Sequence, residues 1–386
     1  MRPTSDFNFR FLVLLVCMFV LFTTLESCAQ SSDQATSTKN KTIKIALLLD
    51  TSNSMDGLIE QAKSQLWSIV NELSMARCDG AKPNIQIALY EYGNSRLTQS
   101  SGYIKMVTPL TADLDKLSAD LFALTTNGGD EFCGQVILTA TDQLQWNVDG
   151  NDLQVIFIAG NEPFNQGFIN YVQACQVAKS KKIVVNTIYC GDFSEGINSQ
   201  WKTGADLTGG AYMSIAQNTK TVFIESPYDD KISALNDSLN NTYIGFGRSG
   251  IEKKKMQQEQ DQNAESYSKA NKVNRAVTKS SYVYKNESWD LVDAEKGGTV
   301  KVEALSENQL PAEMKSMNVQ QRKAYVKLNA EKRDKITAQI NELNTKRNQY
   351  LAEQQKLSAN KDNSTLDNAM MQAVRKQAIA QHFVFE

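Results

Sequence analysis

The segment IKIALLLDTSNSMDG, residues 43–57, constrains the fold more than any other part of the 386-residue chain. Six of the seven residues before Asp50 are apolar, which predicts a strand that is buried on both faces. A short run of hydroxyl and amide residues follows Asp50, and apolar residues then recur at helical spacing. A strand buried on both faces needs helices above and below it, so the segment predicts an α/β fold.

Strand and helix patterns alternate from this segment to about residue 245. Five further strands are expected, at residues 84–93, 102–111, 153–161, 182–191 and 211–215, with amphipathic helices between them. The alternation predicts a doubly wound, mostly parallel sheet flanked by helices, of Rossmann-like type, over residues 41–245. Ligands bind at the carboxyl ends of the strands in such sheets, and Asp50 lies at one of these ends.

The composition changes after the glycine-rich run at 245–250, and residues 246–386 are expected to be mainly α-helical. An extended segment is expected to interrupt the helices at 282–305. Between residues 336 and 357 the apolar spacing is that of a coiled coil, but Arg347 and Gln354 occupy alternate positions of the seam. The pattern therefore favours helices that pack within the chain over an oligomerising coiled coil.

The N-terminus resembles the signal of a bacterial lipoprotein. An apolar run of about a dozen residues, 11–22, is too short for a comfortable membrane span. Leu25 and a small residue precede Cys28 as in a lipoprotein cleavage site, which implies that 1–27 are removed and that Cys28 carries the lipid. Residues 28–40 form a polar linker. The alternatives are an ordinary cleaved signal or an uncleaved anchor, and all three place the rest of the chain outside the cytoplasm. The lipoprotein signal implies a membrane-anchored protein of the cell envelope.

Charge and residue counts exclude several classes of function. The net charge of −2 gives no basic excess for nucleic-acid binding. The single histidine, His382, removes histidine-based triads and histidine-ligated metal sites. The cysteines after Cys28 include no CxxC pair, so a zinc ribbon or a thioredoxin-like site is not expected.

The motif DTSNS, residues 50–54, combines a carboxylate with two hydroxyls at alternate positions. In its context between a strand and a helix, the motif resembles the opening of the metal-ion-dependent adhesion site (MIDAS) of von Willebrand factor A domains. Mg²⁺ prefers oxygen ligands, and the resemblance implies that Asp50, Ser52 and Ser54 hold Mg²⁺, or Mn²⁺ or Ca²⁺ in its place. The simpler alternative is that these residues only cap the following helix.

This chain departs from the family at two further positions. The family takes a threonine from a later loop, and Asp130 occupies that place here, with Thr126 as the alternative. The family has an aspartate after its fourth strand, where this chain has Gly160. The resemblance therefore implies either that Asp130 replaces the missing carboxylate, or that the site is degenerate and metal-free. If Asp130 does not contribute, Glu131 and Glu162 are the next candidates.

Two cysteines are expected near the loop that contains Asp130. Cys133 follows it directly, and Cys190 ends a strand that points to the same face. A disulfide between them and a pair of buried free thiols remain equal alternatives.

These observations favour a non-enzymatic, membrane-anchored lipoprotein that binds a protein partner through a divalent metal. The first alternative is a structural envelope scaffold with a metal-free site. A metal-assisted hydrolase is less favoured, because the sequence has no phosphate loop, no serine elbow and no histidine cluster. No binding of nucleic acid is expected.

Lipidation at Cys28 is directly testable. We expect mass spectrometry of the mature protein to find Cys28 as the first residue, with its mass raised by an attached lipid. A mature N-terminus at any other residue would show that the segment is an ordinary signal or an anchor.

Overall fold

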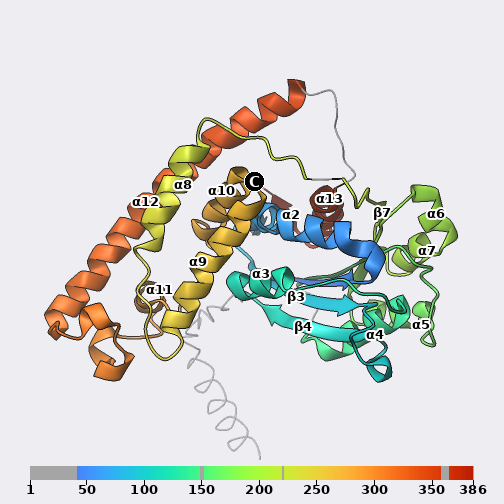
Figure 1. The fold of residues 1–386 in the computed structure, drawn as a ribbon, viewed down its shortest axis with the longest axis horizontal. Coiled ribbons are helices and arrows are strands. Elements are labelled where there is room, and N and C mark those ends of the chain that lie inside the picture. Colours follow the sequence, from blue (N-terminus) through green and yellow to red (C-terminus); the bar gives the residue numbers. More distant parts are fainter. Residues whose placement is uncertain (1–40, 148–151, 220, 358–364, 386) are drawn as a thin grey trace, which may run out of the picture. The chain divides into compact units, whose positions relative to one another are not determined.

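The computed structural model describes residues 41–147, 152–219, 221–357 and 365–385 (Figure 1). The expected signal peptide, Cys28 and the linker lie outside these residues. The residues from 41 onwards belong to one compact unit. Within the described ranges, no helix combines the length and the apolar character needed to cross a membrane.

A six-stranded sheet forms the centre of the unit and confirms the predicted α/β class. Edge strand β4 runs antiparallel to β3, and all other neighbours are parallel. The strand order is β4-β3-β1-β5-β6-β7, with β1 Thr42–Asp50, β3 Asn84–Tyr92, β4 Ile104–Thr111, β5 Leu153–Gly160, β6 Val184–Tyr189 and β7 Tyr212–Ser214.

Helices cover both faces of the sheet because β1 is apolar on both faces. Ile45 and Leu47 pack into the core beneath α2 and α3, whereas Ala46 and Leu48 pack into the core beneath α4, α5 and α7. This is the sandwich that the continuous apolar pattern of β1 predicts. The helices of this part are α2 Asp56–Ser74, α3 Leu114–Phe122, α4 Cys133–Gln143, α5 Tyr171–Ser180, α6 Phe193–Asn198 and α7 Trp201–Asp206.

The C-terminal region is mainly helical, as predicted. In Figure 1, α9 and α10 stand between the long helix α12 and the helices α2 and α3. The helices are α8 Asp229–Asn240, α9 Gly250–Tyr267, α10 Lys269–Lys279, α11 Leu291–Lys296, α12 Val319–Leu357 and α13 Leu366–Ile379. The expected extended segment at 282–305 is wrong. It contains α11, because the Asp290 side chain accepts the backbone N–H of Asp293 and caps that helix.

Buried arginines fix α12 to its neighbours within the chain. Arg347 donates through Nε to Asp229 of α8 at 2.9 Å, and Arg333 donates to Asp290 at 2.6 Å. Arg347, which interrupts the apolar seam expected for a coiled coil, is thus paired with an acid of the same chain. This agrees with packing between neighbouring helices, and no coiled coil between copies is shown.

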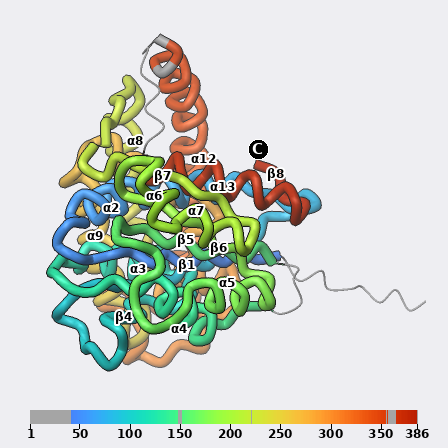
Figure 2. The backbone as a smooth tube through the Cα atoms, turned by 90° about the vertical axis from the view of Figure 1, so that its right-hand side faces the viewer, coloured from blue at the N-terminus to red at the C-terminus, as the bar shows by residue number. Residues whose placement is uncertain are grey.

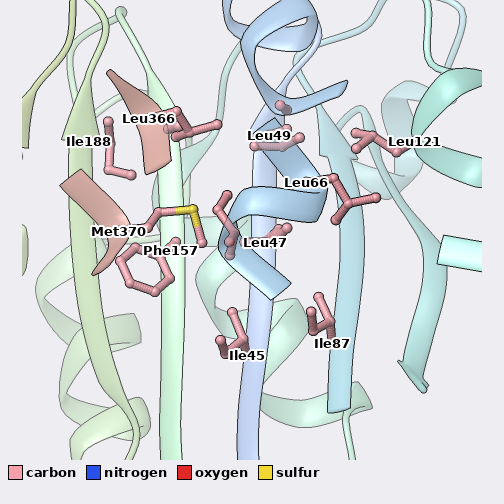
Figure 3. Close-up of a pocket in the computed structure, with 13 residues that line it drawn as sticks. Ile45, Leu47, Leu49, Leu66, Ile87, Leu121, Phe157, Ile188, Leu366 and Met370 are labelled. Carbon is pink, nitrogen blue, oxygen red and sulfur yellow. The ribbon is translucent and has the colours of Figure 1, made fainter. Parts of the chain in front are cut away.

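The last helix, α13, returns to the sheet (Figures 1 and 2). Figure 3 shows the side chain of Met370 between Phe157 of β5 and Leu47 of β1. These residues and Leu366 line an apolar void of about 20 Å³ in the core. The chain then ends in β8, Phe383–Phe385, which pairs antiparallel with β2, Ala76–Cys78. The C-terminal residues therefore complete the core that begins with β1.

One buried arginine joins the two regions. Arg275 of α10 is fully buried, lies over the ring of Trp67 of α2 at 4.5 Å, and forms ion pairs with Asp115 of α3 at 2.9 Å and Asp261 of α9 at 2.5 Å. Lys279 adds a second cation 3.0 Å from Asp261. Burial by itself would raise the pKa of Asp261, but Lys279 and Arg275 hold that pKa far below its usual range.

Asp261→Asn should strongly destabilise the protein, because it leaves Arg275 and Lys279 buried with too little negative charge. We expect a loss of about 3–5 kcal/mol in the free energy of unfolding, measured by urea denaturation. Asp206→Asn is the matched control, because Asp206 pairs with Lys202 at 2.6 Å on the surface, and it should change stability by less than about 0.5 kcal/mol. Equal effects of the two substitutions would contradict this account.

Candidate functional site

The carboxyl ends of three neighbouring strands meet at one edge of the sheet. β1 ends in Asp50, whose register partner on β3 is Tyr92, and Leu49 pairs with Ala159 just before Gly160 ends β5. The edge therefore gathers Asp50, Tyr92 and Gly160, which lie far apart in the sequence.

The turn after β1 holds both serines of the motif close to Asp50. The Ser52 backbone N–H donates to Asp50 Oδ1 at 2.8 Å, and Ser52 Oγ lies 3.2 Å from Ser54 Oγ. Ser54 Oγ in turn donates to Asn161 Oδ1 at 3.3 Å. Neither the short 3₁₀ helix Asn53–Met55 nor α2 has a side-chain cap at its N-terminus. The capping alternative is therefore wrong, because neither hydroxyl caps a helix in the structure.

Asp50 is the most constrained acid of the edge. Its side chain is fully buried, and its Oδ2 atom has no hydrogen-bond partner. Burial raises the pKa of Asp50 to about 7; the N–H and hydroxyl of Ser52 oppose this rise, and the Glu162 carboxylate adds to it. The charged side chain that raises the pKa of Asp50 is thus another acid, and the buried Oδ2 atom has no hydrogen-bond donor among the described residues.

The structure brings Glu131, and not Asp130, to Asp50. Both acids pack against Gly93. A β-carbon added to Gly93 would lie 2.8 Å from Cγ of Glu131 and 2.9 Å from Oδ1 of Asp50, so the two side chains are neighbours. Glu131 is 8% exposed, and its burial together with the carboxylates of Asp50 and Glu162 raises its pKa to about 8. Asp130 is exposed. Successive side chains of this loop point in different directions, so position along the sequence could not tell the two acids apart.

Thr126, the alternative ligand, is engaged elsewhere. Its hydroxyl forms a hydrogen bond with the carboxylate of Asp56, at the start of α2. The described loop thus contributes Glu131 to the edge, and its threonine supports the neighbouring helix.

Gly160 has no room for the aspartate that the family places there. A β-carbon at this position would lie 2.6 Å from the hydroxyl of Tyr92 and 3.0 Å from Asp50 Oδ2. The Tyr92 hydroxyl donates to the backbone oxygen of Ala159 at 3.0 Å and is fully buried. Tyr92 therefore takes the space of the missing aspartate. Sequence analysis missed this residue, although it ends a predicted strand at the same edge.

The two cysteines of the loop region are both buried free thiols in the structure. Cys133 Sγ lies 3.9 Å from the Tyr92 hydroxyl, and the backbone N–H of Cys190 donates to the oxygen of Gly160. Burial raises the pKa of both thiols, with Asp50 adding to the rise. Of the two alternatives, the structure thus has the free thiols and no disulfide between Cys133 and Cys190.

The arrangement fits a divalent cation that is held partly by hydroxyls. No three His, Cys, Asp or Glu side chains converge on one point in the described part of the chain, so a site made only of these residue types is not seen. The edge instead offers the unpartnered oxygen of Asp50, the hydroxyls of Ser52 and Ser54, and the carboxylate of Glu131. These are the hard oxygen donors that Mg²⁺ and Ca²⁺ prefer.

Comparisons with known proteins agree with this fold. The family model of the von Willebrand factor type A domain matches residues 44–237, which is half of the chain. No curated protein sequence matches the chain.

Similar solved structures include a conserved hypothetical protein, BatB, from Bacteroides thetaiotaomicron, with 17% identity, a TM-score of 0.35, and coverage of 45% of this chain and 90% of that one. The SpRpn10 VWA domain has 16% identity and a TM-score of 0.34, with coverage of 45% and 87%. Proximal thread matrix protein 1 from the mussel byssus has 12% identity and a TM-score of 0.32, with coverage of 45% and 41%.

The close packing at Gly160 leads to a prediction. Gly160→Ala should destabilise the protein by about 1–3 kcal/mol in urea denaturation, because the added β-carbon overlaps the Tyr92 hydroxyl. Tyr92→Phe removes that hydroxyl, so the double variant should lose less stability than the two single losses combined. Additive losses would show that Tyr92 does not fill this space.

Proposed function

Because the chain belongs to the von Willebrand factor type A domain family, we propose that it is a protein-binding module that holds a divalent cation at the carboxyl edge of its sheet. Domains of this family often take part in protein–protein interactions. The proposal concerns binding and not catalysis.

The observation that carries the proposal is the buried, unpartnered oxygen of Asp50. An uncompensated buried carboxylate is strongly unfavourable, so such a group is normally protonated, paired or bound to a metal. Glu131 and Glu162 add negative charge near Asp50 instead of offsetting it. A divalent cation would provide the missing positive charge.

Asp50, Ser52, Ser54 and Glu131 are the residues that would hold the ion. Glu131 replaces Asp130 in the ligand set expected from the sequence, because it is the acid that lies beside Asp50. The bound ion would supply an electrophilic centre for an oxygen of the partner. Mg²⁺ is the first candidate, with Mn²⁺ and Ca²⁺ as alternatives, and the two carboxylates suit Ca²⁺ because Ca²⁺ accepts more oxygen ligands.

The same proposal includes the place of the protein in the cell. A lipid on Cys28 would anchor the chain to the membrane of the cell envelope, and the polar linker 28–40 would separate the domain from the lipid. The partner would then be another envelope or surface protein. A metal-free scaffold is the competing function, and the experiment below distinguishes the two.

Metal binding should depend on Glu131 and not on Asp130. We expect Mg²⁺, Mn²⁺ or Ca²⁺ at 100 times its dissociation constant to stabilise the wild type by about 2.7 kcal/mol, measured as a rise in melting temperature that a chelator reverses. Glu131→Gln should abolish most of this rise, whereas the matched control Asp130→Asn should keep it. Asp50→Ala should raise the melting temperature of the metal-free protein, because it removes a buried uncompensated carboxylate, and should abolish the response to metal.

Two outcomes would contradict the proposal in different ways. If none of the three ions changes the melting temperature or gives heat in calorimetric titration, the edge is metal-free and the scaffold function is favoured. If Asp130→Asn loses the response and Glu131→Gln keeps it, the ligand set expected from the sequence is the correct one. Capture of a partner from envelope extract by the wild type, but not by Asp50→Ala, would connect the ion to binding.

A further inference from the structure

A second group of buried polar residues lies far from the sheet edge, where α8, α9 and α10 meet. Lys279 is the last residue of α10, and its side chain is fully buried. Its Nζ donates to the two oxygens of Asp261 at 3.0 and 3.2 Å and also contacts the side-chain oxygen of Asn240. Asn240 is the last residue of α8, and Asp261 belongs to α9.

One carboxylate oxygen connects the amine and the amide. Asp261 Oδ2 accepts from Asn240 Nδ2 at 2.7 Å and from Lys279 Nζ at 3.0 Å. The carbonyl carbon of Asn240 is one bond of about 1.23 Å from the oxygen that Lys279 contacts, so it lies close to the amine nitrogen. An amine, a carboxamide carbon and a carboxylate that can carry a proton are therefore held together, with Lys279 and Asp261 buried and Asn240 partly buried, as an acyl transfer requires.

We propose that Lys279 and Asn240 form an intramolecular isopeptide bond, with Asp261 as the proton carrier. The Lys279 amine attacks Cγ of Asn240 in its neutral form, through the nitrogen lone pair. The new Nζ–Cγ bond forms and the Cγ–Nδ2 bond breaks. The attacking nitrogen loses one proton, Asp261 passes that proton to the departing nitrogen, and ammonia leaves. The charge balances, and neither an oxidant nor a further reactant is needed.

The surroundings of Lys279 favour the attack and also limit its rate. Burial lowers the pKa of Lys279 to about 8, with Arg275 adding to the fall and Asp261 and Asp115 opposing it. A larger fraction of this amine is therefore neutral at pH 7 than for an exposed lysine. Arg275 donates to Asp261 at 2.5 Å, which makes the carboxylate a weaker base. We therefore expect a slow reaction that is faster at pH 9 than at pH 7.

The bond would join the end of α8 to the end of α10. Residue 240 lies just beyond the part that matches the family model, which ends at 237, so the bond would tie the family domain covalently to the helices that follow it. This inference is independent of the metal site.

The test compares the full-length wild type with Asn240→Ala and with the matched control Asn241→Ala, all incubated at pH 7 and at pH 9. Asn241 is exposed and next to the reacting residue. Intact-mass spectrometry should show a loss of about 17 Da, the mass of ammonia, in the wild type and in Asn241→Ala. Tryptic digestion should yield peptide 232–248 linked to peptide 276–285, because the modified Lys279 is no longer cleaved.

Asn240→Ala should keep its full mass and release peptide 280–285, while circular dichroism confirms that it is folded. Absence of the linked peptide from the wild type after incubation at pH 9 would overturn the proposal and leave only an ion-pair network. The same loss of mass in Asn240→Ala would also overturn it, because the ammonia would then come from another residue.

Discussion

Burial of the Arg275 guanidinium is the constraint on which the arrangement of the helices depends. A buried cation without partners would be strongly unfavourable, so Asp115 and Asp261 must approach it from two different helices. Trp67 contributes the face of its ring from a third helix. The C-terminal helices therefore cannot move away from the sheet domain without exposing or unpairing this charge.

Asp50 is a buried acid that lacks partners of this kind. Asp50 is as deeply buried as Arg275, yet one of its oxygens has no hydrogen bond and the nearest charged side chains are acids. A structural ion pair would show the balance seen around Arg275. The imbalance at Asp50 is the basis of the proposal that the edge holds a cation from outside the chain.

The edge also differs from the family pattern in a physically consistent way. The Tyr92 hydroxyl fills the space beside Gly160, so a carboxylate cannot stand there. Glu131 is the acid that lies beside Asp50. In the proposed site, Glu131 would supply the carboxylate that Gly160 cannot.

Local pattern determined most of the fold, because apolar periodicity reports which faces of a strand or helix are buried. The alternation of apolar strands and amphipathic helices after residue 41 was sufficient to predict the sheet and its flanking helices. The DTSNS motif likewise placed Asp50, Ser52 and Ser54 in one turn, because these residues are neighbours in the sequence.

Only the tertiary structure decided which distant residues reach that edge and which helices complete the core. The choice of Glu131 over Asp130 depends on the direction of each side chain in an irregular loop, which has no periodicity to report it. The roles of Tyr92 at the edge and of Met370 in the core depend on packing between segments far apart in the chain. Residues 282–305 contain the short helix α11 because Asp290, whose carboxylate caps α11, is held by Arg333 from a distant helix. Such contacts between distant residues leave no local signal, so the sequence by itself could not predict them.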